Sequence, residues 1–336
     1  MPSQDESARS RSAPPSSPSK KISSWVYVFA PASVANFGVG FDVLGAALEG
    51  PGDVVHARLT DKPGVRLLGI SGDGGRLPLS ARRNTAAVAA AAVLEAAGER
   101  RRGLDLTLEK GLPLSSGMGS SAASAAAGAL AAGLLLGMTD RAALLRPALL
   151  GEHVADGSWH GDNVFASLLG GLVLVPSSDP EGPLAPLRLG APARLRLVLV
   201  HPALELETRR ARGVVPRKVP MAVHTAHAAA LASLVAALAD GDLARAGRAL
   251  LEDRIVDPVR LPLIPGGRAV LDAMLAAGAH GACLAGAGPS LLGLTEDGPR
   301  AGRIARAAEA AWRRAGVAAH ASVHRLDAKG ARRLRS

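Results

Sequence analysis

The sequence predicts an α+β fold with two domains. Predicted strands and helices follow one another without strict alternation, which favours an α+β plan over a doubly wound sheet. The chain has 336 residues, of which 48% are hydrophobic, enough for a sizeable core and for two domains of ordinary size. A stretch rich in proline and glycine, residues 177–193, is the best candidate for the boundary between the domains.

The first half of the chain contains predicted strands interleaved with three predicted helices. Apolar and β-branched runs bounded by glycine or proline predict strands at 25–30, 53–59, 65–70, 104–109 and 171–176. Helices are predicted at 84–97, from 120 onward, and from 140 to about 153. Asn84 or Thr85 can cap the first of these helices, and Asp140 can cap the last. The polar and glycine-rich stretch 31–40 follows the first strand.

The second half has the same mixed character. Strands are predicted at 195–200, 291–295 and 319–325, and helices at 223–238, 243–251, 268–278 and 300–315. Residues 120–138 carry no charge over 19 positions, close to the length of a membrane span. Because this run is mostly alanine, glycine and serine, we expect a helix buried in a core, and no association of the chain with a membrane.

The single cysteine and the N-terminal segment bear on where the protein works. Cys283 cannot form an internal disulfide and suits a reducing compartment, so a cytoplasmic location is expected. Cys283 lies in an apolar stretch and is interpreted as a small buried side chain. Residues 1–24 are rich in serine, proline and arginine without an apolar run, which predicts a disordered leader and not a secretory signal.

The positive charge does not predict a nucleic-acid partner. Of the net charge of +10, residues 300–336 contribute +8, from ten basic residues against Glu309 and Asp327. Four of these arginines lie at helical spacings, which is typical of a solvated helix face. No zinc-finger spacing, aromatic RNA-stacking motif or basic-zipper pattern is present in the sequence.

The run from Pro113 to Ala123, which reads PLSSGMGSSAA, predicts a phosphate-binding loop between a strand and an alanine-rich helix. Its glycines allow close approach of the backbone to an anion, and the helix start supplies unpaired N–H groups. The Walker A pattern occurs nowhere in the chain. Gly117-x-Gly119-x-x-Ala122 fits the loose dinucleotide pattern, but no second strand ending in an acidic residue follows at the required distance.

This run resembles the second motif of the GHMP kinases, a family that includes galactokinase, homoserine kinase, mevalonate kinase and phosphomevalonate kinase. Met118 replaces the leucine usual in that motif. Residues 30–45 resemble the first motif in its homoserine kinase form, and residues 284–291 resemble the third, with Ala285 and Ala287 in place of its serines. The resemblance implies two α/β-sandwich domains, at 25–185 and 186–336, with the active site between them.

The resemblance implies ATP as the phosphate donor and Mg²⁺ as its companion. By the family pattern, Ser121 and Glu152 would hold the metal, and one serine and one carboxylate suffice because Mg²⁺ keeps several waters. Residues near Asn84 and Thr85 would contact the adenosine. The loop residues that would bind ATP are Pro113, Leu114, Ser115, Ser116, Gly117, Met118, Gly119, Ser120, Ser121, Ala122 and Ala123.

The first motif implies an amino acid with a hydroxyl group, L-homoserine, as the small-molecule substrate. Asp42 is a carboxylate that could hold an ammonium group, and guanidinium groups suit a carboxylate because they bind it bidentately. Without the resemblance, each of these residues reads as a turn former, a loop residue or a surface arginine. The residues implied for the substrate are Asn36, Asp42, His160, Asn163, Arg212 and Arg260.

The implied reaction is transfer of the γ-phosphoryl group to the side-chain hydroxyl, a step in threonine biosynthesis. Ser121, Glu152, Asp162 and Asn163 are the candidate catalytic residues, and Asp162 is the carboxylate to test as a base. Direct passage of the hydroxyl proton to phosphate stays open, because the resemblance to homoserine kinases does not imply a catalytic aspartate base. Three alternatives stay open: a GHMP kinase for another acceptor such as mevalonate or shikimate, an inactive binding protein of the same fold, and a basic nucleic-acid-binding protein. The resemblance also leaves a homodimer open.

Overall fold

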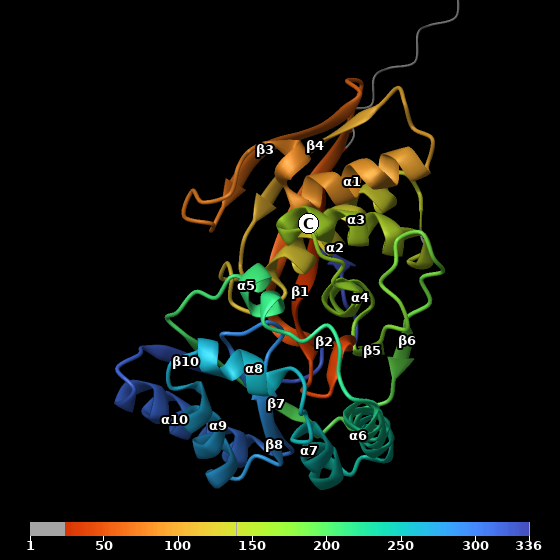
Figure 1. The fold of residues 1–336 in the computed structure, drawn as a ribbon. Helices are drawn as coiled ribbons and strands as arrows, with labels where there is room; N and C mark the ends of the chain where they lie inside the picture. The colour runs from red at the N-terminus through yellow and green to blue at the C-terminus, as the bar shows by residue number, and fades with distance from the viewer. Residues whose placement is uncertain (1–23, 139, 336) are drawn as a thin grey trace, which may run out of the picture.

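The computed structural model describes residues 24–138 and 140–335, which form two sheets with helices packed on them (Figure 1). The mixture of elements is the predicted α+β architecture. Of the predicted leader, residues 1–23 lie outside the described part of the chain.

The first sheet is built around one long strand. Strand β2, Gly40–Thr60, pairs antiparallel with β1 (Val26–Asn36), β4 (Gly103–Glu109) and β5 (Leu172–Leu174). β4 pairs parallel with β3 (Gly64–Ser71), which is one edge of the sheet. Two short strands from later in the chain complete it: β6 (Leu187–Leu189) pairs with β5, and β11 (Arg332–Arg333) pairs with β1.

Four helices pack together with this sheet: α1 (Thr85–Ala96), α2 (Ser120–Leu135), α3 (Ala142–Asp156) and α4 (Gly161–Leu169). α2 is buried along most of its length and contacts α1, α3, α4, β1 and β2. Its small side chains allow this close packing, and a Cβ at Gly128 would lie 2.2 Å from the carbonyl oxygen of Ala86. The prediction that the uncharged run forms a core helix is therefore confirmed.

The second sheet has the order β10 (Ala319–His324), β7 (Arg196–Pro202), β9 (Leu291–Thr295), β8 (Gly281–Leu284), and all its pairs are antiparallel. Side chains of β7 point alternately into two hydrophobic clusters, and the strand is apolar because both of its faces are buried. Leu197 and Leu199 pack in the cluster that includes α6 (Met221–Asp240) and α7 (Leu243–Leu250). Val198 and Val200 pack in the cluster that includes α9 (Gly267–Ala276) and α10 (Gly298–Arg314).

Two short helices from the second half of the chain lie where its two parts meet. α5 (Thr208–Gly213) and α8 (Asp257–Arg260) lie between the helices of the first sheet and those of the second (Figure 1). Two 3₁₀ helices, Ala81–Arg83 and Leu261–Leu263, precede α1 and follow α8. Because β6 and β11 both join the first sheet, the division at residues 185 and 186 stays a prediction.

Helix α6 is the one helix among the described residues that is long and apolar enough to cross a membrane by length and composition alone. Its N-terminal half is largely exposed, while Leu234, Ala237 and Leu238 are buried against the rest of the second domain. An apolar helix of this kind also occurs in proteins that cross no membrane, so the expected absence of a membrane stays a prediction.

Candidate active site

A cavity of about 420 Å³ lies where the phosphate loop, the start of α4, α5 and α8 meet. Its walls come from both halves of the chain and bring together most of the residues singled out in the sequence. These are Asn36, Asp42, Asn84, Thr85, Leu114, Ser115, Ser116, Gly117, Gly119, Ser120, Ser121, Glu152, His160, Asp162, Asn163, Arg212 and Arg260.

Four residues of the predicted ATP loop do not line this cavity. Met118, Ala122 and Ala123 are buried in the hydrophobic core, because their side chains face the helices and not the cleft. Pro113 lines a second cavity, together with Leu112 and Leu114. At these positions backbone groups are left to contact a nucleotide, so the place of these four residues in the ATP loop stays a prediction.

The phosphate loop joins β4 to α2 and is held close to two other segments. A Cβ at Gly117 would lie 2.7 Å from the carbonyl oxygen of Ala285 and 2.9 Å from that of Gly288. The segment 285–288 therefore packs directly against the loop and leaves no room for a side chain at Gly117. A Cβ at Gly119 would lie 2.0 Å from Ser33 Oγ. Both glycines also have positive φ values, +75° and +63°, which side chains disfavour.

The start of α2 is open to an anion. Gly119 occupies the N-cap position, and no side chain caps the helix there. The first N–H groups of a helix lack partners inside the helix and lie at the positive end of its dipole. Because Ser120 and Ser121 at this point line the cavity, the helix start is suited to bind phosphate groups.

Ser121 and Glu152 lie together beside this helix start. Ser121 Oγ donates a hydrogen bond of 2.8 Å to Glu152 Oε1. The second carboxylate oxygen, Oε2, is buried and has no hydrogen-bond partner among the described residues. Burial raises the pKa of Glu152 to about 7, although the charge of His160 and the bond from Ser121 oppose the rise. A buried carboxylate oxygen without a partner, on a residue that lines the cavity, is available to a cation.

The pair Ser121 and Glu152 fits Mg²⁺ in its donor chemistry. Both donors are hard oxygens, and Mg²⁺ commonly takes one or two protein ligands and completes its shell with water and phosphate oxygens. Among the described residues no cluster of three or more His, Cys, Asp or Glu side chains could hold a metal ion by itself. A metal site here therefore depends on a bound nucleotide for its remaining ligands.

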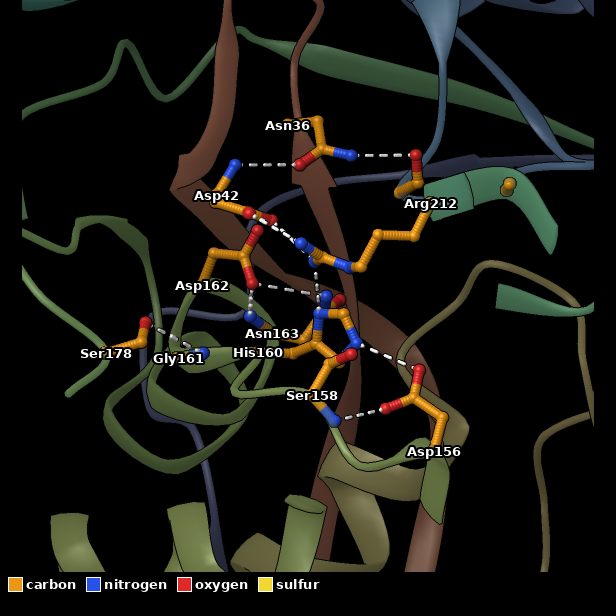
Figure 2. A network of polar contacts seen from close by, with 12 residues as sticks. Asn36, Asp42, Asp156, Ser158, His160, Gly161, Asp162, Asn163, Ser178 and Arg212 are labelled. Carbon is orange, nitrogen blue, oxygen red and sulfur yellow. Dashed lines mark hydrogen bonds and ion pairs between the residues drawn. The ribbon is translucent and has the colours of Figure 1, made fainter. Parts of the chain in front are cut away.

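At the other end of the cavity, Asp42 and Arg212 form an ion pair (Figure 2). Arg212 Nη1 and Nη2 each donate to one oxygen of Asp42, at 2.8 Å. Asp42 lies at the start of β2 with φ of +58°, and Arg212 lies on α5. The residues predicted to bind the two charges of an amino acid thus neutralise each other when no ligand is present.

His160 links this pair to Asp156. Arg212 Nη2 lies 3.2 Å from His160 Nδ1, and His160 Nε2 lies 3.1 Å from Asp156 Oδ2 (Figure 2). In the neutral ring Nδ1 accepts, because a guanidinium only donates, and the ring proton lies on Nε2, where it is donated to Asp156. Burial alone would lower the pKa of His160, but the bond to Asp156 and the charge of Glu152 outweigh it and raise the pKa.

Asn36 and Arg260 anchor the walls of this end. Asn36 Oδ1 accepts from the amide of Asp42 at 3.1 Å, and its Nδ2 donates to the carbonyl of Gly286 at 2.7 Å. Arg260 is buried and donates to the carbonyls of Ala211 and Gly286, at 3.0 and 3.2 Å. Asn36 therefore fixes the backbone that carries Asp42, and its predicted contact with the substrate stays a prediction.

Asp162 and Asn163 form the first turn of α4, which the sequence alone reads as an ordinary loop. Asn163 Oδ1 accepts a bond of 3.1 Å from Ser33 Oγ, and Asp162 Oδ1 accepts from the amide of Asn163 at 2.9 Å. Burial and the charge of Asp42 raise the pKa of Asp162 to about 6, against the opposing charge of His160. The carboxylate is thus a stronger base than an exposed aspartate.

Lys110 was not predicted from the sequence, although it directly precedes the loop. Its Nζ forms a buried ion pair with Asp53 and donates to the carbonyl of Ser120 at 2.8 Å and to Ser124 Oγ at 2.9 Å. Burial lowers the pKa of Lys110, although the charge of Asp53 opposes this effect. The other lining residues that the sequence did not single out are Leu77, Arg83, Ser124, Ala155, Asp156, Glu207, Thr208 and Arg209. Gly286 and Ala287, which belong to the predicted third motif, also line the cavity.

Comparison with known proteins identifies the family. The model of the GHMP kinases N terminal domain matches residues 84–171, and that of the GHMP kinases C terminal domain matches residues 234–314. The chain is 41% identical to a homoserine kinase of Arabidopsis thaliana over 317 residues, covering 93% of this chain and 85% of that protein. The chain belongs to the GHMP kinase family.

Other GHMP kinases extend the likeness to three dimensions. A homoserine kinase of Xanthomonas campestris is 43% identical over 311 residues, covering 91% of this chain and 93% of the relative. The crystal structure of homoserine kinase from Cytophaga hutchinsonii superposes with a TM-score of 0.87 at 40% identity, covering 92% of this chain and 97% of that one. The predicted GHMP-kinase fold is therefore confirmed.

Proposed function

We propose that this GHMP kinase transfers the γ-phosphoryl group of ATP to the side-chain hydroxyl of L-homoserine, which gives O-phospho-L-homoserine for threonine biosynthesis. The observation that carries the proposal is the composition of the cavity of about 420 Å³. A helix start suited to phosphate lies at one end, and a carboxylate paired with a guanidinium lies at the other. The relatives named homoserine kinase support the same substrate.

At the nucleotide end, the backbone N–H groups of the loop and of the α2 start would hold the phosphates. Ser121 and Glu152 would hold Mg²⁺, which when bound neutralises charge on the phosphate oxygens. The buried clamp of Lys110, Asp53 and Ser124 fixes the start of α2 against β2. These residues bind and position the nucleotide, which is the main contribution a protein makes to phosphoryl transfer.

At the acceptor end, Asp42 would receive the ammonium group and Arg212 the carboxylate, so that a zwitterion replaces the existing ion pair. Arg260, whose guanidinium lies 4.9 Å from the centre of the Phe41 ring, adds positive charge to the same wall. A substrate with only one of the two charges would leave either Asp42 or Arg212 without a partner. The site is thereby suited to amino acids over mevalonate, shikimate or sugars.

In the proposed step, a bond forms between the homoserine hydroxyl oxygen and the γ-phosphorus, and the bond to the β–γ bridging oxygen breaks. ADP leaves with the bridging oxygen. Asn163, which is held by Ser33, would orient the hydroxyl group. Asp162 is the candidate acceptor of the hydroxyl proton, because its pKa of about 6 leaves it ionised at neutral pH and more basic than usual.

The acceptor is tested by measuring ATP consumption with Mg²⁺ and, in turn, L-homoserine, mevalonate, shikimate and galactose. We expect turnover with L-homoserine only, because the other three carry no ammonium group for Asp42. Turnover with another acceptor and none with homoserine would reject the proposed substrate. No turnover with any of the four would favour an inactive binding protein of this fold.

Replacement of Arg212 by alanine should raise the KM for L-homoserine by roughly tenfold or more, since a charge-assisted hydrogen bond is worth about 1.5–3 kcal/mol. The KM for ATP should change little. Arg210 lies on the same helix, is exposed and does not line the cavity, so Arg210→Ala is the matched control. Equal KM values for homoserine in the two variants would remove Arg212 from the acceptor site.

A further inference from the structure

A chain of hydrogen bonds through three residues links the second sheet to the backbone of the phosphate loop. His201 lies on β7, Ser290 lies between β8 and β9, and Ser116 lies in the loop itself. His201 Nδ1 is 3.0 Å from Ser290 Oγ, and Ser290 Oγ donates a bond of 2.5 Å to the carbonyl oxygen of Ser116. Ser290 is completely buried and lines no part of the cavity that holds the candidate active site.

The chemistry of these contacts fixes the direction of each hydrogen bond. A carbonyl oxygen only accepts, so the one hydroxyl hydrogen of Ser290 goes to Ser116. Ser290 Oγ must then accept from His201, which places a ring proton on Nδ1. Burial, with a contribution from the charge of His320, lowers the pKa of His201, so the ring is neutral and this is its one proton.

The bond to the Ser116 carbonyl also determines where the next amide points. The peptide between Ser116 and Gly117 is trans, since the one cis bond among the described residues is Gly288-Pro289. In a trans peptide the C=O and N–H groups point in opposite directions. With its carbonyl directed to buried Ser290, this peptide directs the N–H of Gly117 away from Ser290, and Gly117 itself lines the cavity.

A glycine at this position makes a second orientation accessible. Flipping the peptide changes ψ of Ser116 and φ of Gly117, and glycine adopts either sign of φ at little cost. The flipped peptide would place a carbonyl oxygen, and not an N–H, at the phosphate site. A hydrogen bond to the Ser116 carbonyl therefore favours the present orientation, in which φ of Gly117 is +75°.

We propose that His201 is a positioning residue which, through Ser290, holds the Ser116–Gly117 peptide so that the Gly117 N–H faces the nucleotide phosphates. The inference deepens the proposed ATP-dependent reaction and rests on it. It assigns a part of the ATP-site geometry to a histidine of the second domain, which itself lies outside the cavity.

Two amide variants, each of which places a nitrogen near the position of one ring nitrogen of His201, separate this role from a general packing role. In His201→Asn the side-chain amide nitrogen takes the place of Nδ1 and can still donate to Ser290. In His201→Gln the amide nitrogen takes the place of Nε2 and cannot. We expect the Kd for ADP and the KM for ATP to rise about tenfold in His201→Gln and in His201→Leu, as for loss of one charge-assisted bond, and to stay within about threefold in His201→Asn.

The measurements are isothermal titration with ADP and with adenosine, steady-state kinetics, and thermal melts of each variant. Adenosine affinity and the KM for homoserine should not change, because neither involves the Gly117 amide. Ser290→Ala should weaken ADP binding to the same degree, and adding His201→Leu to it should cause no further loss. His320 pairs with His201 across the sheet. Loss of His320 removes only a charge that disfavours protonation of His201, so Nδ1 keeps its proton, and His320→Leu is a control that should bind ADP normally.

The outcomes are distinct. Equal ADP affinity in His201→Asn and His201→Gln would overturn the proposal, as would a parallel loss of ADP, adenosine and homoserine binding, which indicates disrupted packing. If a leucine variant does not fold, the comparison of asparagine with glutamine still decides. Failure of the wild-type protein to bind ADP would reject the proposed function and, with it, the basis of this inference.

Discussion

Replacement of Glu152 by glutamine should make the ligand-free protein more stable at neutral pH and at the same time nearly inactive. Glu152 is buried, and its pKa is raised from 4.5 to about 7. The ionised carboxylate therefore destabilises the fold when no cation is bound. A neutral amide of the same shape removes this cost and can still accept the bond from Ser121.

The sign of the pH dependence follows from the raised pKa. The folded protein binds the Glu152 proton more tightly than the unfolded chain, so wild-type stability falls as the pH rises from about 4.5 to about 7 and then levels off. Above that range the glutamine variant should be more stable by about 3 kcal/mol, or roughly 5 °C in Tm. Below pH 4.5 the two proteins should melt together.

The same substitution should lower kcat/KM by about 100- to 1000-fold, since a Mg²⁺ ligand is lost and metal stabilisation is worth several kcal/mol. Mg²⁺ with ADP should raise the Tm of the wild type much more than that of the variant. Glu95, exposed on α1, provides the control, and Glu95→Gln should change neither stability nor activity. A variant that is both less stable and fully active would contradict this account of Glu152.

The parts of the site that could be predicted from the sequence are those encoded locally. The loop at Pro113–Ala123 and the helix after it depend on neighbouring glycines, serines and alanines, so their pattern is visible in one stretch. In the stretch 31–40, by contrast, the polar and glycine-rich sequence does not indicate a strand, and the strand predicted at 25–30 is too short. β1 continues to Asn36 since β2 supplies partners from later in the chain.

The contacts that give the site its charge pattern are formed between distant segments. Asp42 and Arg212 are 170 residues apart, and His201 and Ser290 are 89 apart, so no spacing in the sequence links them. Burial is equally invisible, and it is burial that raises the pKa values of Glu152 and Asp162. The motif resemblance identified several site residues, but it did not predict that Asp42 and Arg212 form an ion pair with each other when no ligand is bound.

Replacement of Asp42 by asparagine should change which ligands the acceptor site prefers. In the free protein, Arg212 is occupied by Asp42, so an incoming carboxylate must compete with it. L-homoserine supplies an ammonium group to Asp42 in exchange, whereas 4-hydroxybutyrate has the same chain, carboxylate and hydroxyl group without the ammonium. In the wild type, 4-hydroxybutyrate should therefore inhibit weakly.

In Asp42→Asn the ammonium partner is lost, and Arg212 is released from its ion pair and keeps only the contact with His160. The KM for L-homoserine should rise by roughly 10- to 100-fold, as expected for loss of a charge-assisted contact. Inhibition by 4-hydroxybutyrate should become stronger, by about tenfold, because its carboxylate no longer displaces Asp42. Opposite effects of one substitution on two ligands cannot come from general disruption of the site, which would weaken both.

A matched variant separates release of Arg212 from a simple change in local charge. Asp156→Asn removes a negative charge from the same network but leaves the bond between Asp42 and Arg212 in place, since Asp156 contacts His160. Its Ki for 4-hydroxybutyrate should stay close to that of the wild type. If both variants strengthen inhibition equally, long-range repulsion explains the effect. If Asp42→Asn weakens inhibition, the ion pair seen here does not control access of a carboxylate to Arg212.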